Sequence, residues 1–142
     1  SGLIAESKLA PELANEAHYY RAKALLAEGQ NKEATGDLAV LAKDTRNVYG
    51  AEAKYLLAQL YFDNGETGKA EKEVLDYIEV STPHAYWLAR SFVLLSDVYM
   101  KLGRNLDAKQ YLLSLQQNYQ ADDDIAEMIE TRLAKLNKGS KQ

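Results

Sequence analysis

Three glycines mark the same position in three consecutive stretches of this chain. Gly29, Gly65 and Gly103 are separated by 36 and then 38 residues, and the residues around them agree in size at five aligned positions. These positions hold Ala22, Ala58 and Ser96; Leu25, Tyr61 and Tyr99; Ala34, Ala70 and Ala108; Leu38, Val74 and Leu112; and Leu41, Tyr77 and Leu115. Self-similarity at a period of this length is typical of stacked helical repeats. We call each set of aligned positions a column. Columns of small residues let helices approach closely, and columns of large residues fill the space between layers.

Each repeat is predicted to be a pair of helices joined by a tight turn at the glycine. Apolar residues recur at helical spacing on both sides of each glycine, and only two prolines occur in 142 residues. We therefore expect one domain over residues 1–142, an all-α solenoid of three helical hairpins plus a C-terminal capping helix. The hairpins are predicted at about residues 15–48, 51–82 and 85–120, the capping helix at 123–138, and a disordered tail at 139–142.

Prolines and polar residues predict where helices begin. Pro11 suits the first turn of the first long helix, and Thr82 and Pro83 suit the cap and first position of the third hairpin. Residues 47–50 are expected to be a linker. The acidic run at 122–124 fits the start of the capping helix, because carboxylates stabilise a helix N-terminus.

The two ends of the predicted stack differ. The last helix has one apolar stripe and one charged face, which suits a terminal unit. At the other end, Leu3, Ile4 and Leu9 are apolar and have no cap before them. The chain also begins without methionine and shows no signal peptide. We interpret it as a fragment or mature form, the C-terminal end of a longer array, with self-association through the uncapped N-terminal end left open.

Charge and composition argue against several functions. The net charge is −4 and no basic stripe stands out, so binding to nucleic acid has little electrostatic support. The absence of cysteine excludes disulfides, thiolate metal sites and cysteine nucleophiles, and is neutral about compartment. The apolar runs are too short to span a bilayer, so we expect no direct membrane insertion.

No group of residues suggests an active site, a cofactor site or a metal site. His18 and His84 are the only histidines, and they fall in different repeats without the HExxH spacing. We expect both to have surface or interface roles. The turn at 63–66 lacks the alternating acidic ligands of a calcium loop. No catalytic residue, cofactor or metal is therefore predicted.

The repeats resemble the tetratricopeptide repeat (TPR) family. Residues 57–61 (LAQLY) and 95–99 (LSDVY) are each followed by the aligned glycine and then the aligned alanine, as in that family. Residues 21–25 (RAKAL) match less well, only Phe92 supplies the large first residue, and the closing proline stands one place late at Pro83. The units also exceed the usual length of about 34 residues. The resemblance covers about residues 15–119.

A narrower similarity concerns the third hairpin. Residues 86–92 (YWLARSF) and 108–112 (AKQYL) are similar to the end of large TPR proteins of the bacterial cell envelope. This similarity implies a periplasmic or cell-envelope location, with the cytoplasm left open. The TPR resemblance itself implies a right-handed superhelix in which the first helices line a concave groove.

The resemblance also implies which residues line the groove. They are Glu16, Tyr19 and Lys23 in unit one; Glu52, Tyr55, Gln59, Phe62 and Asp63 in unit two; and Arg90, Asp97 and Lys101 in unit three, with Leu26, Val93 and Met100 beside them. A surface of aromatic, apolar and charged residues suits an extended peptide or a partner helix. For Tyr19 and Tyr55, filling between layers is left open as an alternative.

Other large residues also have two interpretations. Phe62 and Met100 belong to the groove by register, but packing against the next layer is an equal alternative. Tyr20 and Trp87 are expected to fill space between helices rather than to bind a partner.

One known binding mode of the family is not expected here. Some members hold the terminal carboxylate of a peptide with lysine and asparagine side chains. The corresponding positions hold Tyr19, Lys23, Leu56, Arg90 and Leu94. Two cations remain, but the asparagines are missing.

The sequence therefore predicts a non-catalytic interaction module that holds a protein or peptide partner in its groove. Two alternatives stay open. The chain could be a structural spacer or self-association segment of a longer repeat protein, or an accessory repeat domain of an enzyme whose catalytic part lies elsewhere.

Overall fold

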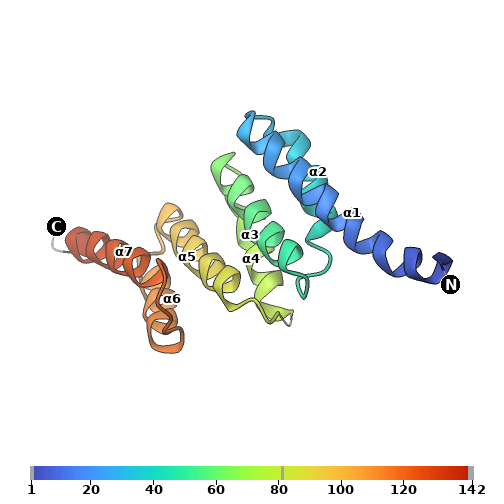
Figure 1. Cartoon of the computed structure of the whole chain (residues 1–142). Coiled ribbons are helices and arrows are strands. Elements are labelled where there is room, and N and C mark those ends of the chain that lie inside the picture. The colour runs from blue at the N-terminus through green and yellow to red at the C-terminus, as the bar shows by residue number, and fades with distance from the viewer. Residues whose placement is uncertain (1, 81, 141–142) are drawn as a thin grey trace.

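Helices make up all the regular structure in the described part of the chain. The computed structural model describes the backbone of residues 2–80 and 82–140 and the side chains of residues 12–80 and 82–138. The helices are α1 (Gly2–Ala27), α2 (Asn31–Leu41), α3 (Val48–Asp63), α4 (Thr67–Glu79), α5 (Ala85–Lys101), α6 (Asn105–Asn118) and α7 (Ile125–Ser140) (Figure 1). No strand occurs among these residues, so the predicted all-α class is confirmed.

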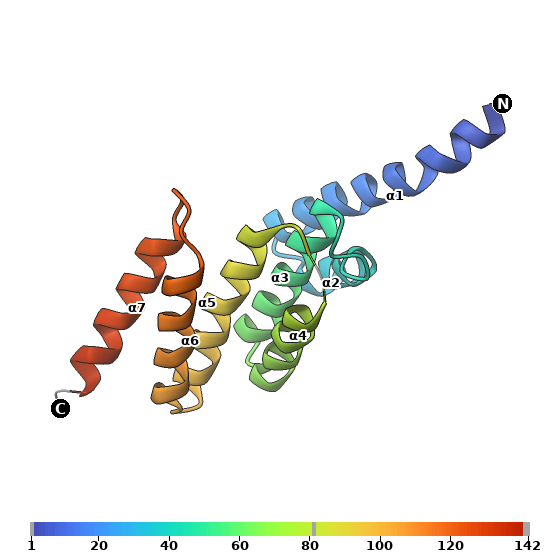
Figure 2. The ribbon, with the colours of Figure 1, turned by 90° about the horizontal axis from the view of Figure 1, so that it is seen from below.

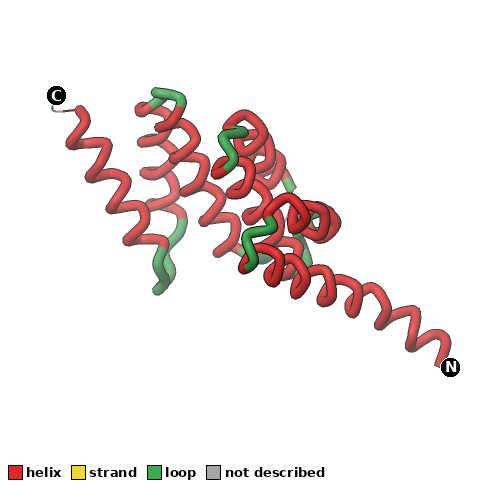
Figure 3. Tube along the Cα trace, turned by 90° about the horizontal axis from the view of Figure 1, so that it is seen from above, coloured by secondary structure: helices red, strands yellow, loops and turns green. Residues whose placement is uncertain are grey.

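The helices pack as successive antiparallel pairs. α1 packs on α2, α3 on α4 and α5 on α6, while α7 packs on both α5 and α6. The second helix of each pair contacts the first helix of the next pair, and α3 also contacts α1 and α5. The pairs follow one another from the N-terminus to the C-terminus (Figure 2), and only short loops connect the helices (Figure 3).

Each pair turns at its aligned glycine by the same hydrogen-bond pattern. Gly29, Gly65 and Gly103 all have φ near +80°, at 78°, 81° and 77°, a conformation that costs little only for glycine. The amide after each glycine donates to a carbonyl five residues back, as Gln30 does to Leu25 at 2.8 Å. This is the Schellman ending of a helix. The repeat register defined by the glycines is thus present in the backbone.

The aligned columns form the core. All members of the four columns that begin with Ala22, Ala34, Leu38 and Leu41 are buried. In the remaining column Tyr99 is buried and its two counterparts are half-buried. The small columns are therefore sites of close helix contact, as predicted.

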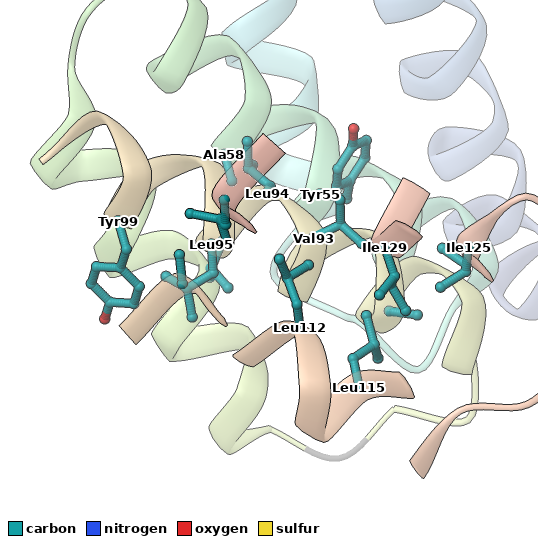
Figure 4. Close-up of a cluster of buried hydrophobic side chains, with 14 residues drawn as sticks. Tyr55, Ala58, Val93, Leu94, Leu95, Tyr99, Leu112, Leu115, Ile125 and Ile129 are labelled. Atoms are coloured by element: carbon teal, nitrogen blue, oxygen red, sulfur yellow. The ribbon is translucent and has the colours of Figure 1, made fainter. Parts of the chain in front are cut away.

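The buried side chains form two clusters. The smaller cluster joins units one and two around Leu38 and Leu57. The larger cluster joins α3, α4, α5, α6 and α7, where residues such as Leu112, Ile125 and Ile129 gather (Figure 4). The last helix therefore shares a core with the second and third units.

Two helices begin earlier than the sequence predicts. α1 begins at Gly2 and continues through Pro11, so the prediction that Pro11 starts this helix is wrong. Proline removes one intrahelical hydrogen bond, which weakens a helix without necessarily ending it. The side chains of Leu3, Ile4 and Leu9 lie outside the described residues. In Figure 2 the N-terminal part of α1 projects past the other helices.

The expected linker at residues 47–50 is the start of α3. The Asn47 side chain accepts hydrogen bonds from the amides of Tyr49 at 2.8 Å and Gly50 at 3.4 Å, which caps the helix. A Cβ atom at Gly50 would lie 1.8 Å from the carbonyl oxygen of Asp44. Glycine is therefore required here by close backbone approach.

The segment before α5 links two loops instead of starting the helix. α5 begins at Ala85, so the predicted roles of Thr82 as cap and Pro83 as first helical residue are wrong. The Thr82 hydroxyl donates to the carbonyl oxygen of Thr45 at 2.8 Å, which ties the α4–α5 loop to the α2–α3 loop. Residue 81 lies outside the described residues.

The C-terminal helix begins and ends two residues later than the predicted 123–138, at Ile125 and Ser140. α7 reaches Ser140, so residues 139 and 140, expected in a disordered tail, are helical. Residues 141–142 lie outside the described residues. Asp123 accepts a hydrogen bond from the amide of Ile125 at 2.9 Å, which agrees with the capping role predicted for the acidic run.

Candidate functional site

The predicted groove residues lie along α1, α3 and α5, and several of them join neighbouring helices. At the α1–α3 junction, the Tyr19 hydroxyl donates to Glu52 Oε1 at 2.9 Å and Lys23 Nζ lies 3.0 Å from Glu52 Oε2. Glu52 is only 9 % exposed, so these two partners satisfy a buried carboxylate. Burial and the hydrogen bond to Glu52 raise the pKa of Tyr19 to about 12.

A second group joins α3 to α5. Arg90 Nη2 donates to the Tyr55 hydroxyl at 2.9 Å, and the Arg90 guanidinium carbon lies 4.8 Å from the centre of the Tyr55 ring. The Tyr55 hydroxyl donates to Gln59 Oε1 at 2.9 Å, and Gln59 Nε2 donates to Asp63 Oδ1 at 2.8 Å. Tyr55 is 5 % exposed and belongs to the core. Its ring thus fills space in the core while its hydroxyl links the bonded side chains of α3 and α5. We call the bonded side chains along α1, α3 and α5 the polar row: Tyr19, Lys23, Glu52, Tyr55, Gln59, Asp63 and Arg90.

A third junction, between α5 and α7, includes a residue that the sequence analysis missed. Arg132 donates to Asp97 through Nε at 2.8 Å and through Nη2 at 2.9 Å. Such a two-point pair is geometrically specific as well as strong. No sequence signal marked Arg132, because the register defined by the three glycines does not extend to α7.

The polar row ends in a cavity of about 650 Å³ bounded by α3, α5, α6 and α7. Its lining residues are Phe62, Asp97, Met100, Lys101, Asn105, Thr131, Arg132, Lys135 and Leu136. Lys101 Nζ lies 5.6 Å from the centre of the Phe62 ring, within cation–π range.

Charge in this cavity is unevenly neutralised. Asp97 neutralises Arg132, but neither Lys101 nor Lys135 forms an ion pair with any carboxylate among the side chains that the structure describes. Both lysines are exposed, whereas Phe62 and Met100 are partly buried. The cavity therefore combines a cationic rim with an apolar floor.

The predicted groove residues fall into three classes in the structure. Phe62, Asp97 and Lys101 line the cavity, and Met100 lines it with them. Those that bond within the polar row are Tyr19, Lys23, Glu52, Tyr55, Gln59, Asp63 and Arg90. Glu16 is exposed on α1, whereas Val93 is buried in the core. Phe62 and Met100 also pack against the core, so both interpretations of these residues hold in part.

The prediction that Trp87 and Tyr20 fill space between helices is confirmed for one of them and wrong for the other. Trp87 packs between Tyr55 and Tyr86, with ring centres 5.8 and 5.0 Å away. Tyr20, by contrast, is 58 % exposed, so its predicted role as filling is wrong. Its ring meets the Tyr19 ring edge-on, with ring centres 5.4 Å apart, and the rest of the side chain stays in solvent.

The two histidines occupy polar contacts at interfaces, as expected. His18 Nδ1 lies 2.8 Å from Asp37 Oδ1, and Arg21 Nε donates to Asp37 Oδ2 at 2.8 Å. These bonds, chiefly those from Arg21, hold the pKa of the Asp37 carboxyl below its usual range. His84 Nε2 lies 2.9 Å from the carbonyl oxygen of Arg46. The described residues contain no group of three potential metal ligands.

The acidic run before α7 also joins helices. The Tyr86 hydroxyl donates to Asp124 at 2.8 Å, and the Tyr119 hydroxyl donates to Asp123. Burial and the bond to Asp123 raise the pKa of Tyr119 to about 12. Asp123 and Asp124 therefore fasten the start of α7 to α5 and α6.

Comparison with known proteins adds no relative to this picture. No protein-family model, no curated protein and no solved structure matches the chain. Among the described residues, no helix is both long enough and apolar enough to cross a membrane.

Proposed function

We propose that this chain is a non-catalytic interaction module, a right-handed TPR-like superhelix that binds a protein or peptide segment along α1, α3, α5 and α7. The packing order supports the superhelix, because each second helix contacts the next first helix. Three identical glycine turns support a regular repeat. A periplasmic or cell-envelope location belongs to the same proposal and depends on the resemblance of the third hairpin.

The observation that carries the binding role is the cavity at the end of the polar row. Binding pockets combine apolar walls with a few polar groups that fix orientation. Phe62, Met100 and Leu136 supply the apolar part, and the rim presents Lys101 and Lys135. We propose that the bound segment carries a carboxylate beside a large apolar side chain. The carboxylate would lie between the lysines and the apolar side chain against Phe62.

Random dodecapeptides displayed on phage provide a direct test, with the purified chain as bait. Enriched peptides should pair Asp or Glu with an aromatic or aliphatic residue. Each exposed ion pair contributes about 0.2–1 kcal/mol, so the double substitution Lys101→Ala with Lys135→Ala should weaken binding roughly tenfold.

Lys72→Ala with Lys109→Ala is the matched control. Both lysines are exposed, on α4 and α6, and neither lines the cavity. Binding that survives the cavity substitutions, or that falls equally with the control pair, would argue against the cavity as the site. Failure to enrich any peptide would count against peptide binding altogether.

A further inference from the structure

One stripe of α1 is apolar and uncovered. Leu13, Ala17, Tyr20 and Ala24 recur at alternating steps of four and three residues and so share one helix face. Leu13 is 61 % exposed and Tyr20 is 58 % exposed, and both alanines are exposed as well. We call these four residues the α1 stripe.

The same register positions are covered in the other two units. The counterparts of the α1 stripe are Tyr49, Ala53, Leu56 and Leu60 in α3, and Trp87, Ser91, Leu94 and Val98 in α5. All eight are buried or half-buried. Both helices of the preceding pair pack there, since α2 packs on α3 and α4 packs on α5. The Tyr49 and Trp87 rings also pack on the preceding first helices, against Tyr19 of α1 at 4.6 Å and Tyr55 of α3 at 5.8 Å between ring centres. The α1 stripe thus continues an established type of helix–helix interface, without its covering helix among the described residues.

The order of side chains in the α1 stripe is self-complementary. Large and small residues alternate along it, as Leu13, Ala17, Tyr20 and Ala24. A two-fold axis between positions 17 and 20 sets Leu13 opposite Ala24 of a second copy, and Ala17 opposite its Tyr20. Every large residue then faces an alanine, which allows the two helices to approach closely.

We propose that α1 docks antiparallel on α1 of a second copy, so that the chain forms a two-fold homodimer through the α1 stripe. A two-fold interface uses one self-complementary patch twice and closes without leaving free ends. Tyr19 and Lys23 bond to Glu52 from a different face of α1, so dimer formation leaves the polar row accessible.

A head-to-tail stack is the competing arrangement, and the charge on α7 disfavours it. The exposed side of α7 carries the charged residues Glu127, Glu130 and Lys138 and has alanine as its only apolar residue type, so it is poorly matched to the α1 stripe. Stacking would also generate open chains of increasing length.

Sedimentation equilibrium of the full chain over a range of concentrations tests the proposal. The wild type should fit a monomer–dimer equilibrium, and Ala17→Glu with Tyr20→Glu should raise the dimer dissociation constant at least tenfold. Ala39→Glu with Val40→Glu, two exposed positions on α2, adds the same charge and should leave the constant unchanged. All four residues are exposed, so far-UV circular dichroism should confirm that both variants fold.

Cross-linking then tests the antiparallel register. The chain contains no cysteine, so introduced thiols are the only ones. A disulfide requires Cα atoms within about 7 Å. Oxidation of a mixture of Leu13→Cys and Ala24→Cys chains should give the mixed dimer, whereas Leu13→Cys alone should cross-link at least tenfold more slowly.

Several outcomes would overturn the proposal. These are a monomer at every concentration, a dimer indifferent to the α1 stripe substitutions, assemblies that keep growing beyond two chains, and rapid cross-linking of Leu13→Cys alone. A monomer that associates only with a helix from a different protein would assign the α1 stripe to that partner instead.

Discussion

The helices at the two ends of the stack, α1 and α7, are packed in similar ways but carry different side chains on their outer faces. Each is joined to its neighbour in the row of first helices by a polar link, Tyr19 to Glu52 at one end and Arg132 to Asp97 at the other. α7 buries its apolar stripe and exposes charged residues. α1 also packs on its neighbours, yet it leaves Leu13 and Tyr20 exposed.

This difference shows that the end of a repeat stack is defined by side chains on the outward face and not by position alone. A polar outer face, as on α7, suits the end of a repeat stack, whereas the apolar outer face of α1 suits further packing. Substitutions at the two ends of the stack test whether their packing differs in this way.

The largest effect is expected from truncating a buried residue of α7. Ile129 is 1 % exposed in the larger cluster, so Ile129→Ala should lower the free energy of unfolding by about 2–5 kcal/mol. Leu13→Ala, at the exposed end, should change it by less than about 0.5 kcal/mol. Urea unfolding should be followed at the lowest workable protein concentration, so that association does not contribute. Equal losses would show that the two ends are packed alike.

The next effect concerns the polar contact that holds α1 on α2. Asp37 is 4 % exposed and accepts charge-assisted hydrogen bonds, so Asp37→Asn should cost about 1.5–3 kcal/mol at neutral pH. The pKa of Asp37 is lowered in the folded state, so its contribution is present above the unfolded-state pKa and lost as pH falls through the folded-state pKa. Urea unfolding at several pH values should show the gap between wild type and variant closing in acid.

Asp76→Asn is the control for that measurement. Asp76 is exposed on α4, and its substitution should shift stability by less than about 0.5 kcal/mol. A gap between wild type and Asp37→Asn that stayed constant or widened in acid would contradict the assigned role of this carboxylate.

A smaller effect is expected at the turn after α1. Gly29 has a φ of +78°, so Gly29→Ala should cost about 1–2 kcal/mol through backbone strain. Gly36 lies within α2, where an added Cβ meets nothing within 4 Å, and Gly36→Ala should stabilise the helix by up to about 1 kcal/mol. Thermal unfolding of both variants should therefore give shifts of opposite sign. Shifts in the same direction would exclude a special role for the turn.

The smallest effect separates two adjacent tyrosines of α1. Tyr19→Phe removes the hydrogen bond to the buried Glu52 and should cost about 1 kcal/mol. Tyr20→Phe changes an exposed hydroxyl beside Tyr49 and should cost less than about 0.5 kcal/mol. The folded-state pKa of Tyr19 is raised to about 12, so the stability it contributes is present below pH 10 and is lost as pH rises through 12. Absorbance titration of tyrosinate, wild type minus Tyr19→Phe, should show a midpoint near 12. A midpoint at the ordinary tyrosine value would contradict the Glu52 contact.

The sequence predicted the parts of the fold that depend on size and backbone conformation. The turns at Gly65 and its counterparts require a left-handed φ, which favours glycine. The close helix contacts at Ala70 and its counterparts require a small residue, so both features can be recognised from residue type alone. Helix starts were harder to place. Pro11 is compatible with both the start and the interior of a helix, and only tertiary context decides between them.

The site was predicted only in part. The repeat register predicts which residues lie on the groove face of each first helix, but not which residues of other helices contact them. The register identified Asp97 and Lys101, yet it did not identify Arg132 or Lys135, which come from the unpaired last helix. Tyr20 was misassigned for a related reason. Its register position is covered by a preceding helix pair in the other units, whereas no helix pair precedes α1 among the described residues.

The three glycine turns also bear on how the chain folds. Each turn joins helices that are adjacent in sequence, and the described helices contact only their near neighbours along the chain. Proteins dominated by such local contacts fold quickly, since little loop-closure entropy is lost before contacts form. Folding can start in any hairpin and spread to the next, so the free energy of the whole is close to a sum over units and junctions. A lesion in the first hairpin should then unfold that hairpin while the α5–α7 end keeps its structure.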